Sequence, residues 1–294
     1  MDIAIMYHYV KERNWRGIFP LEPHKFEEQV ELLSKYYNIV CPDELNNPPK
    51  DKPYCVLTFD DGTKDQYQNA FSILKKKGIP GYFTVMSGPL ENREIPIIHL
   101  VHAGLSFYSD EEIWNELNEL YNLKEVPELS NIYSYEKDNF RRYNKYTFNF
   151  YLPEIKSREY LEKKLFRFFK SRENFIEDYY INKPELIQMR KEGMTLGVHC
   201  VNHLPYSGDA NEFYMREIEP CVEYLKNQIG VIPEWYTPAF GGGERKDKMI
   251  NDLEPILIHN GFKGGFTTIP GFNKGLSNFW LNRFDCVDIP PFKK

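Results

Sequence analysis

The 294-residue sequence has few cysteines and lacks a long hydrophobic segment. Its five cysteines are scattered and odd in number, which is typical of free thiols in a reducing compartment rather than of a disulfide framework. No apolar run approaches the ~20 residues that a membrane-crossing helix needs. The first residues, Met1 to Ile5, contain neither the basic region nor the apolar stretch of a secretion signal. We therefore expect a cytoplasmic protein without a transmembrane segment.

An excess of positive charge is also missing. The formal net charge is -6 and no domain-sized region is strongly basic, so we expect no binding to nucleic acid. The sequence does contain 41% hydrophobic and 16% aromatic residues, a composition typical of a folded protein rather than a disordered one. Its length suits one large α/β domain or two small ones, and either buries a substantial core.

Short strand-like and helix-like segments alternate along most of the chain. Apolar runs predict strands, and the amphipathic segments between them predict helices that end at glycines such as Gly78 and Gly261. The predicted strands cover residues 3–7, 39–40, 54–59, 82–85, 194–198, 234–236 and 262–266. Repeated strand-helix pairs predict a parallel sheet, either open or closed into a barrel.

The alternation stops between residues 92 and 182. This segment contains predicted helices near 111–121 and 158–169, separated by a polar and aromatic stretch. We interpret 92–182 as an inserted, mostly helical subdomain within a larger α/β domain that residues 1–91 and 183–294 form.

Two adjacent carboxylates, Asp60 and Asp61, follow the predicted strand at 54–59. In parallel α/β folds, sites are built at the carboxyl ends of the strands. Adjacent residues of an extended strand point to opposite faces, so the loop must bend before both carboxylates can share a site, and Gly62 permits such a bend. By itself, an Asp-Asp-Gly tripeptide is more often a solvated turn.

Two histidines, His199 and His203, follow the predicted strand at 194–198 in the same way. Their four-residue spacing suits two ligands of one metal ion if the segment between them makes one turn. An isolated histidine is more often structural than a ligand, but this pair ends a strand as Asp60 and Asp61 do. A divalent ion held by Asp61, His199 and His203 would keep open positions for water and make hydroxide available at neutral pH. The combination predicts a metal-dependent hydrolase.

These motifs resemble those of a known family. Thr58-Phe59-Asp60-Asp61-Gly62 and His199-x-x-x-His203 are similar to the first two motifs of the polysaccharide deacetylases with the NodB homology domain, carbohydrate esterase family 4. Further segments that resemble the same family are 6–10, 71–85, 238–241 and 265–271. The resemblance covers residues 2–84 and 184–284 and leaves the insertion unexplained.

The resemblance implies a distorted (β/α) barrel with a metal ion at the carboxyl ends of its strands. In this family pattern Asp60 is the general base, and Asp61, His199 and His203 bind the metal. Zinc is the default ion, although two imidazoles and a carboxylate also suit cobalt, nickel or iron. Asp60 deprotonates the attacking water, and a backbone N–H near Phe240 joins the metal in stabilising the oxyanion.

Two positions depart from the family pattern near these motifs. Cys200 stands where most members have serine or threonine, and we interpret it as a packed thiol rather than a metal ligand. The third motif usually carries an arginine, but Tyr236 and Thr237 occupy that neighbourhood. Arg283, from the last strand, either supplies the missing guanidinium or is a surface residue.

The histidine that serves as catalytic acid in the family is also missing, because residues 284–288 contain no histidine. His8, at the end of the first predicted strand, is our first candidate for this acid, and a hydrogen-bonded core histidine is the alternative interpretation. His99 and His102 in the insertion are further candidates, and they share a face if their segment is helical. Besides a catalytic role, His102 is expected to support substrate binding, as are Phe240 and Arg283.

We therefore predict metal-dependent hydrolysis of an N-acetyl group on an amino sugar of a glycan or glycan precursor, in the biosynthesis of surface polysaccharides. A carbohydrate substrate is the partner that this activity implies, and the sequence indicates no particular oligomeric state. Two alternatives remain open. One is a glycan-binding protein that keeps the metal but has lost turnover, and the other is a metal amidohydrolase that acts on a small non-sugar amide.

Overall fold

The computed structural model describes residues 1–91 and 94–292, which form two compact units. The first unit comprises Met1–Glu12, Pro20–Glu94 and Ile176–Lys294, and the second comprises Arg13–Phe19 and Ile95–Phe175. The second unit therefore adds a short early segment to most of the predicted insertion. The predicted start of the insertion, Asn92, lies outside the described residues.

The first unit is built around one sheet whose named strands pair in parallel. The strands are β1 (Ile3–Tyr7), β2 (Asn38–Ile39), β3 (Tyr54–Phe59), β4 (Tyr82–Met86), β5 (Thr195–Cys200), β6 (Trp235–Tyr236), β7 (Gly264–Gly265) and β8 (Phe284–Asp285). Their order is β7-β6-β5-β4-β3-β1-β8, with β2 paired to β3. The strands expected from the alternation are present close to their predicted bounds.

The two ends of this sheet are linked by hydrogen bonds outside the named strands. Phe266 and Leu281 form a parallel bridge, and the N–H of Thr267 donates to the carbonyl of Leu281 at 2.8 Å. The N–H of Arg283 donates to the carbonyl of Ile269 at 3.0 Å. The sheet therefore curls back on itself as a distorted (β/α) barrel, which confirms the predicted fold class.

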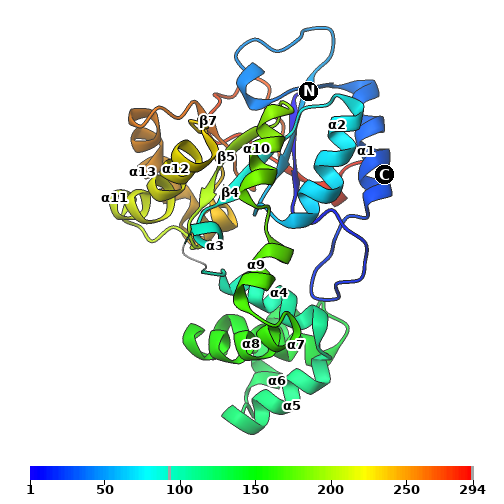
Figure 1. Ribbon diagram of the computed structural model, residues 1–294, viewed down its shortest axis with the longest axis vertical. Helices are drawn as coiled ribbons and strands as arrows, with labels where there is room; N and C mark the ends of the chain where they lie inside the picture. The colour runs from blue at the N-terminus through cyan, green and yellow to red at the C-terminus, as the bar shows by residue number, and fades with distance from the viewer. Residues whose placement is uncertain (92–93, 293–294) are drawn as a thin grey trace. The chain divides into compact units, whose positions relative to one another are not determined.

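Helices surround the sheet of the first unit (Figure 1). They are α1 (Pro23–Tyr36), α2 (Ser72–Lys77), α3 (Gly88–Glu91), α10 (Lys183–Lys191), α11 (Ala210–Phe213), α12 (Glu219–Tyr224) and α13 (Lys246–His259). Helical turns of π type lie at Gln66–Phe71, Tyr214–Ile218 and Leu225–Ile229, and 3₁₀ turns at Pro42–Glu44, Ala239–Arg245 and Cys286–Asp288. Gly78 ends α2 in the left-handed conformation, at φ 63°, as a glycine at that position predicts.

Side chains of the sheet alternate between two faces, and both faces are buried. On the face covered by helices, Tyr7, Phe59 and Phe83 stack with ring centroids 5.0 and 4.3 Å apart. Burying each such side chain stabilises the fold by about 1.5–3 kcal/mol. The other face forms a second cluster, which consists of Ala4, Val40, Leu45, Val56, Tyr82, Trp235, Phe266 and Leu281. This cluster fills the barrel interior. Residues that follow its members along the strands, on the same face, therefore lie at the open end of the barrel.

The second unit is helical (Figure 1). Its helices are α4 (Ile97–Phe107), α5 (Asp110–Tyr121), α6 (Val126–Leu129), α7 (Asn139–Tyr146) and α8 (Glu154–Phe168), with a 3₁₀ turn at Ser130–Tyr133 and a π turn at Thr147–Tyr151. Helix α9 (Arg172–Tyr179) begins in this unit and ends in the first. Across the part of the chain that the structure describes, no helix combines the length and apolarity needed to cross a membrane.

A buried ion pair connects the helices of the second unit. The Nε of Arg141 in α7 lies 2.8 Å from Oδ1 of Asp110 in α5, and its Nη2 donates to Oδ2 at 2.9 Å. The same guanidinium donates to the carbonyls of Arg16 at 2.8 Å and Leu105 at 2.9 Å. One side chain thus ties α7 to the start of α5, to α4 and to the early segment 13–19, which explains why that segment belongs to this unit.

Candidate functional site

The interior face of the barrel carries polar residues where its strands end. Thr58 in β3 and Asp60, directly after the strand, follow Val56 on that face because side chains alternate along an extended chain. Arg283 follows Leu281 in the same way before β8. Asp60 is 2% exposed and Arg283 1% exposed, so both lie inside the fold. They occupy the carboxyl ends of the strands, where barrels of parallel strands place their sites.

Asp61 breaks this alternation. Its φ is 75°, a left-handed conformation that residues other than glycine rarely adopt. The next residue, Gly62, continues the turn at φ 61°, and a Cβ there would lie 3.2 Å from the carbonyl oxygen of Thr84. This strained turn lets the carboxylates of Asp60 and Asp61 face the same end of the barrel, which an extended strand would not allow.

Hydrogen bonds fasten the end of β1 to the turn after β3. The N–H of Val10 donates to Oδ2 of Asp65 at 2.6 Å. The side-chain amide of Gln66 donates to the carbonyl of His8 at 2.7 Å and also to the carbonyl of Asp60. The backbone around Asp60 and Asp61 is therefore held by contacts between the end of β1 and the turn after β3.

The segment after α9 also contacts this turn. Thr63 and Tyr180 form an antiparallel bridge, and the N–H of Ile181 donates to the carbonyl of Gly62 at 3.0 Å. Directly before this bridge, the hydroxyls of Tyr179 and Tyr9 lie 2.8 Å apart. Burial raises the pKa of both tyrosines, and the charge of Asp61 raises it further, so both hydroxyls stay neutral.

Three side chains converge beside this turn. The Nε2 of His199 lies 3.1 Å from Oδ1 of Asp61, and the Nε2 of His203 lies 3.2 Å from the same oxygen. Among the described residues, this is the one group of three or more His, Cys, Asp or Glu side chains with ligand atoms close enough, within 4.8 Å of one another, to hold a metal ion. The structure thus brings together the three residues predicted as ligands, from the ends of β3 and β5.

His199 is oriented by its other ring nitrogen. Its Nδ1 lies 2.7 Å from the carbonyl oxygen of Thr237, which can only accept, so Nδ1 carries the proton and donates. The Nε2 then faces the carboxylate of Asp61. Burial lowers the pKa of His199, but the hydrogen bond and charge of Asp61 outweigh it, and the pKa is raised. The space between Nε2 of His199 and the carboxylate of Asp61 therefore favours a positive charge. That charge can be a second proton on the ring or a metal ion.

His203 lies on an irregular loop after β5. Its φ is 59°, and its N–H donates to Sγ of Cys200 at 3.1 Å. Burial raises the pKa of Cys200 well above its ordinary value, so the sulfur stays a neutral thiol. Cys200 is therefore a packed thiol that accepts a hydrogen bond, in agreement with its interpretation from the sequence.

The donor set fits a divalent transition-metal ion. Two imidazole nitrogens and one carboxylate oxygen are ligands that zinc takes in catalytic sites, where a further position stays open. Ligand atoms bound to one tetrahedral zinc at about 2.0–2.1 Å lie about 3.3–3.4 Å from one another, close to the 3.1 and 3.2 Å separations of Asp61 from the two histidines. These residues therefore fit the ion that the family resemblance implies.

Asp60 is held by a buried guanidinium. Nη1 and Nη2 of Arg283 donate to Oδ1 and Oδ2 of Asp60 at 2.7 and 2.8 Å. Arg283 also donates to Oγ1 of Thr58 at 3.0 Å and to the carbonyl of Thr267 at 2.7 Å. Burial raises the pKa of Asp60, but the charge and hydrogen bonds of Arg283 outweigh it, and the pKa is lowered. Arg283 thus brings a guanidinium to Asp60, and its interpretation as a surface residue is wrong.

His8 lies beside the same carboxylate. Its Nε2 is 4.0 Å from Oδ2 of Asp60, and its side chain is 43% exposed. The alternative interpretation of His8 as a core histidine is therefore wrong, because a core histidine would be shielded from solvent. A partly exposed imidazole at this position can exchange protons with solvent close to a fixed, ionised carboxylate.

Phe240 lies on the glycine-rich turn Ala239–Arg245 and is 51% exposed. Its φ is 52°, and its ring packs edge-on against that of His203, with centroids 4.4 Å apart. The turn approaches its neighbours closely, since a Cβ on Gly241 would lie 2.1 Å from Oγ1 of Thr268. Phe240 thus borders one of the three converging side chains, and its role at an oxyanion stays a prediction.

The remaining predicted residues belong to the second unit. His99 and His102 both lie on α4, with ring centroids 6.2 Å apart, and His99 is fully buried. Neither is part of the Asp-His-His group of the first unit. A catalytic or substrate-binding role for His102 stays a prediction.

Sequence reasoning missed three buried polar residues that support the site. Thr237 orients an imidazole, Gln66 fastens the turn after β3, and Glu217 contacts the loop after β5. A signal for Glu217 is present, because Phe213, Glu217 and Cys221 repeat every four residues and so share the buried helical face. Thr237 lies where the third motif is expected, but nothing there signals its contact with an imidazole, and no spacing or motif marks Gln66.

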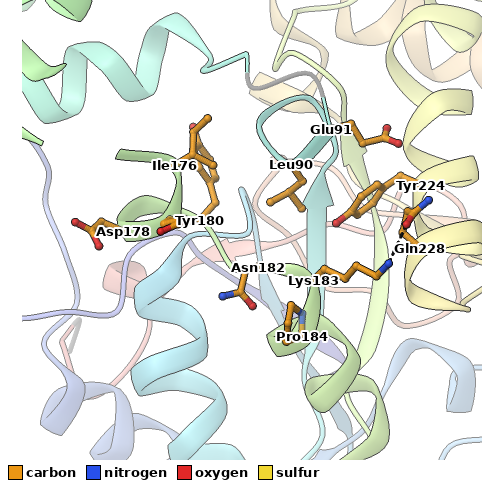
Figure 2. A pocket seen from close by; sticks show the side chains of 11 residues that line it. Leu90, Glu91, Ile176, Asp178, Tyr180, Asn182, Lys183, Pro184, Tyr224 and Gln228 are labelled. Carbon is orange, nitrogen blue, oxygen red and sulfur yellow. Dashed lines mark hydrogen bonds between the residues drawn. The ribbon is translucent and has the colours of Figure 1, made fainter. Parts of the chain in front are cut away.

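A pocket of about 660 Å³ is a separate feature of the first unit (Figure 2). Leu90, Tyr180 and Tyr224 form part of its lining, and Lys183 donates to Oε1 of Gln228 at 2.9 Å within it. No residue of the Asp-His-His group lines this pocket. The candidate metal site therefore lies outside it.

The fold and the site define a (β/α)-barrel hydrolase with a candidate Asp-His-His metal site and a carboxylate held beside it. The sequence matches the family model described as polysaccharide deacetylase over residues 47–122 and 161–255. The chain belongs to the polysaccharide deacetylase family and is a carbohydrate N-deacetylase, which confirms the predicted family and enzyme class. No curated protein sequence matches it significantly.

Solved structures of deacetylases share this fold. IcaB from Ammonifex degensii superposes with a TM-score of 0.58 at 15% identity, over 98% of this chain and 91% of that chain. The Streptococcus pyogenes deacetylase PplD in complex with acetate gives 0.57 at 18% identity, over 97% and 91%. The BpsB deacetylase domain from Bordetella bronchiseptica gives 0.53 at 12% identity, over 97% and 95%. At these identities the likeness concerns the fold alone.

Proposed function

We propose that this deacetylase removes an N-acetyl group from an amino sugar of a glycan by metal-dependent hydrolysis. The observation that supports this most directly is the approach of His199 and His203 to one oxygen of Asp61, at 3.1 and 3.2 Å, with the ionised carboxylate of Asp60 on the adjacent residue. Zinc is the ion that we propose for this set of ligands. Membership in the family supports an acetylated carbohydrate as the substrate.

The proposed first step is attack of water on the acetamide carbonyl. A divalent ion bound by Asp61, His199 and His203 would supply Lewis acidity toward the water and the carbonyl oxygen. Asp60 accepts a proton from the water while the water oxygen bonds to the carbonyl carbon. Arg283 keeps Asp60 ionised and directs its two oxygens through hydrogen bonds of 2.7 and 2.8 Å.

The proposed second step is departure of the amine. When the C–N bond breaks, the nitrogen must gain a proton, and the products are acetate and the free amino sugar. We assign this proton to His8, whose Nε2 lies 4.0 Å from Oδ2 of Asp60 and whose exposed ring can be reprotonated from solvent. A backbone N–H at Phe240 is the proposed additional donor to the oxyanion.

The experiment that tests this function combines metal analysis with an acetate-release assay. Protein reconstituted with zinc is incubated with N-acetylated oligosaccharides, a polysaccharide, a nucleotide sugar and small non-sugar amides. His203→Ala should lose zinc and activity, because one of three ligands is gone. Asp60→Asn should keep zinc and lose hydrolysis. His24→Ala, which changes an exposed histidine on α1, is the matched control and should behave as the wild type.

Each alternative function predicts a different outcome of the same experiment. Zinc binding without acetate release from any substrate would favour a glycan-binding protein, whereas release from small amides alone would favour a non-sugar amidohydrolase. Wild-type protein that binds no zinc, or an Asp60→Asn variant with normal activity, would contradict the proposed mechanism.

We also propose that the substrate is a surface polysaccharide or its precursor, and that the reaction takes place in the cytoplasm. The family supports a glycan substrate, and the choice between polymer and precursor follows from the relative rates on the polysaccharide and the nucleotide sugar. Cell fractionation with an antibody against the chain tests the location, and recovery outside the cytoplasmic fraction would contradict it.

A further inference from the structure

The two histidines of the candidate metal site are held in different ways. His199 is part of β5, so the hydrogen bonds of the sheet fix its backbone. His203 lies beyond the strand with φ 59°. A non-glycine residue in the left-handed region is strained, so surrounding contacts must maintain its conformation. The position of His199 thus depends on the sheet, whereas the position of His203 depends on the contacts that hold its loop.

A buried carboxylate contacts this loop. Glu217 is 1% exposed and lies in the π turn Tyr214–Ile218 that precedes α12. Its Oε2 accepts a hydrogen bond from the backbone N–H of Asn202 at 2.8 Å, and its Oε1 accepts one from the side-chain amide of Asn202 at 3.1 Å. Because Asn202 directly precedes His203, the carboxylate holds the peptide on the amino-terminal side of this ligand.

Packing alone does not account for a glutamate at this position. A buried carboxylate is unfavourable unless it is hydrogen-bonded, whereas an apolar side chain of similar size would fill the same space without a charge to compensate. The two hydrogen bonds to Asn202 therefore indicate that Glu217 serves the geometry of the loop rather than the core.

We propose that Glu217 is a positioning residue that directs the imidazole of His203 toward Asp61 and so sets the affinity and geometry of the metal site. This inference rests on the proposed function. Without the carboxylate, the peptide between residues 202 and 203 is free to leave its strained conformation, while Asp61 and His199 keep their own supports. Loss of a group that orients a metal ligand lowers metal affinity by about 10- to 100-fold.

The test uses two graded variants and a control. Glu217→Ala removes the hydrogen bonds to Asn202 and to the backbone of Leu204, whereas Glu217→Gln keeps one oxygen that can accept from the N–H of Asn202. Zinc affinity, measured by competition with a chromophoric chelator, should fall about 10- to 100-fold in Glu217→Ala and less in Glu217→Gln. The visible spectrum of the cobalt-substituted protein should shift in the same order, because it reports coordination geometry. Glu219→Gln, on an exposed residue of α12, should match the wild type.

If Glu217 had only a structural role, its substitution would lower the stability of the protein but leave the metal site of the folded protein unchanged. The inference is overturned if both Glu217 variants fold, bind zinc as tightly as the wild type and give its cobalt spectrum. Should Glu217→Ala fail to fold, Glu217→Gln and Asn202→Ala decide by the same two measurements, since Asn202→Ala loses only the side-chain hydrogen bond.

Acetate release separates this inference from the function on which it rests. Wild-type protein that binds zinc but releases no acetate contradicts the proposed function, while weakened zinc binding in the variants still supports the role of Glu217. Normal acetate release by the wild type, together with unchanged zinc affinity and cobalt spectrum in the variants, contradicts the role of Glu217 alone.

Discussion

Each unit of the molecule contains a buried arginine–aspartate pair, and the two pairs are nearly the same interaction. In the first unit, Arg283 donates to both oxygens of Asp60 at 2.7 and 2.8 Å, and its side chain is 0% exposed. In the second unit, Arg141 contacts both oxygens of Asp110 at 2.8 and 2.9 Å, and its side chain is 9% exposed. Each guanidinium also donates to two further oxygens.

The surroundings give the two pairs different consequences. Arg141 contacts carbonyls from separate segments of a helical unit, so its pair joins elements of the fold. Asp60 adjoins Asp61 of the candidate metal site, so its pair fixes a carboxylate that can react. A similar bidentate interaction, through Nη1 and Nη2 in Arg283 and through Nε and Nη2 in Arg141, therefore supports the proposed chemistry in one unit and the fold in the other, according to what surrounds it.

The largest expected difference follows from neutralising the aspartate of each pair. Asp60→Asn should reduce kcat for acetate release by about 10²- to 10⁴-fold, because the amide cannot accept the proton of the attacking water. Asp110→Asn should leave kcat unchanged. Both variants leave a guanidinium without its counter-ion, so both should unfold at lower urea concentration. An equal loss of kcat in the two variants would contradict the division of roles between the pairs.

A second expected difference follows from removing the arginine of each pair. Arg283→Met and Arg141→Met each leave a buried carboxylate uncompensated, so the free energy of unfolding in urea should fall by about 3–5 kcal/mol in both. Only Arg283→Met should also lower kcat. Arg283→Lys serves as a control that keeps the charge and loses the two parallel hydrogen bonds. Full activity in Arg283→Met would show that Asp60 needs no fixed orientation.

A smaller difference in kcat is expected when one histidine of each unit is substituted. His8→Gln should lower kcat by about 10²-fold, at the low end for general acids, because solvent can partly replace an exposed imidazole. His102→Gln, in the second unit, should keep kcat. The pair of acetate-release assays identifies the acid: a loss confined to His102→Gln would assign that role to the second unit and remove it from His8.

The smallest expected effect concerns exposed aromatic rings. Phe240→Ala removes the ring that packs edge-on against His203, with centroids 4.4 Å apart, and should weaken zinc binding by about 0.5–1.5 kcal/mol. Phe150→Ala removes a ring of the second unit that is 62% exposed and should leave zinc affinity unchanged. Competition with a chelator measures both, and equal affinities in the two variants would show that the ring of Phe240 does not support the ligand.

Much of the first unit could be predicted because local patterns and the fold agree there. Continuous apolar runs indicated the strands, and the position of Asp60 and His199 at strand ends placed them at one end of the barrel. For Arg283 the sequence left two interpretations open, a guanidinium at the site or a surface residue, because its burial depends on which face of the last segment points into the barrel. The face follows from Leu281, two residues earlier, once the barrel is known.

Other features could not be predicted, because tertiary contacts override local preference. Asp61 and His203 adopt positive φ although neither is a glycine, and each turn makes a hydrogen bond with a distant segment: Gly62 accepts one from Ile181, and Asn202 donates one to Glu217. The segment 13–19 belongs to the second unit through contacts such as the hydrogen bonds from Arg141 to the carbonyl of Arg16 and from Gly17 to Ser106, which no periodicity signals. Contacts of this kind join residues far apart in sequence, so they emerge only from the fold.

The pairing of Thr63 with Tyr180, and of Gly62 with Ile181, bears on when during folding a metal ion could bind the candidate site. The turn after β3 leaves the ribosome long before these partners and before the two histidines. The intervening chain must close a long loop before any of these contacts can form, and such non-local contacts form late in folding. The complete candidate set of ligands therefore exists only after His203 has been synthesised and these contacts have formed. A metal ion bound by this set would stabilise a fold that has already formed rather than guide its first steps.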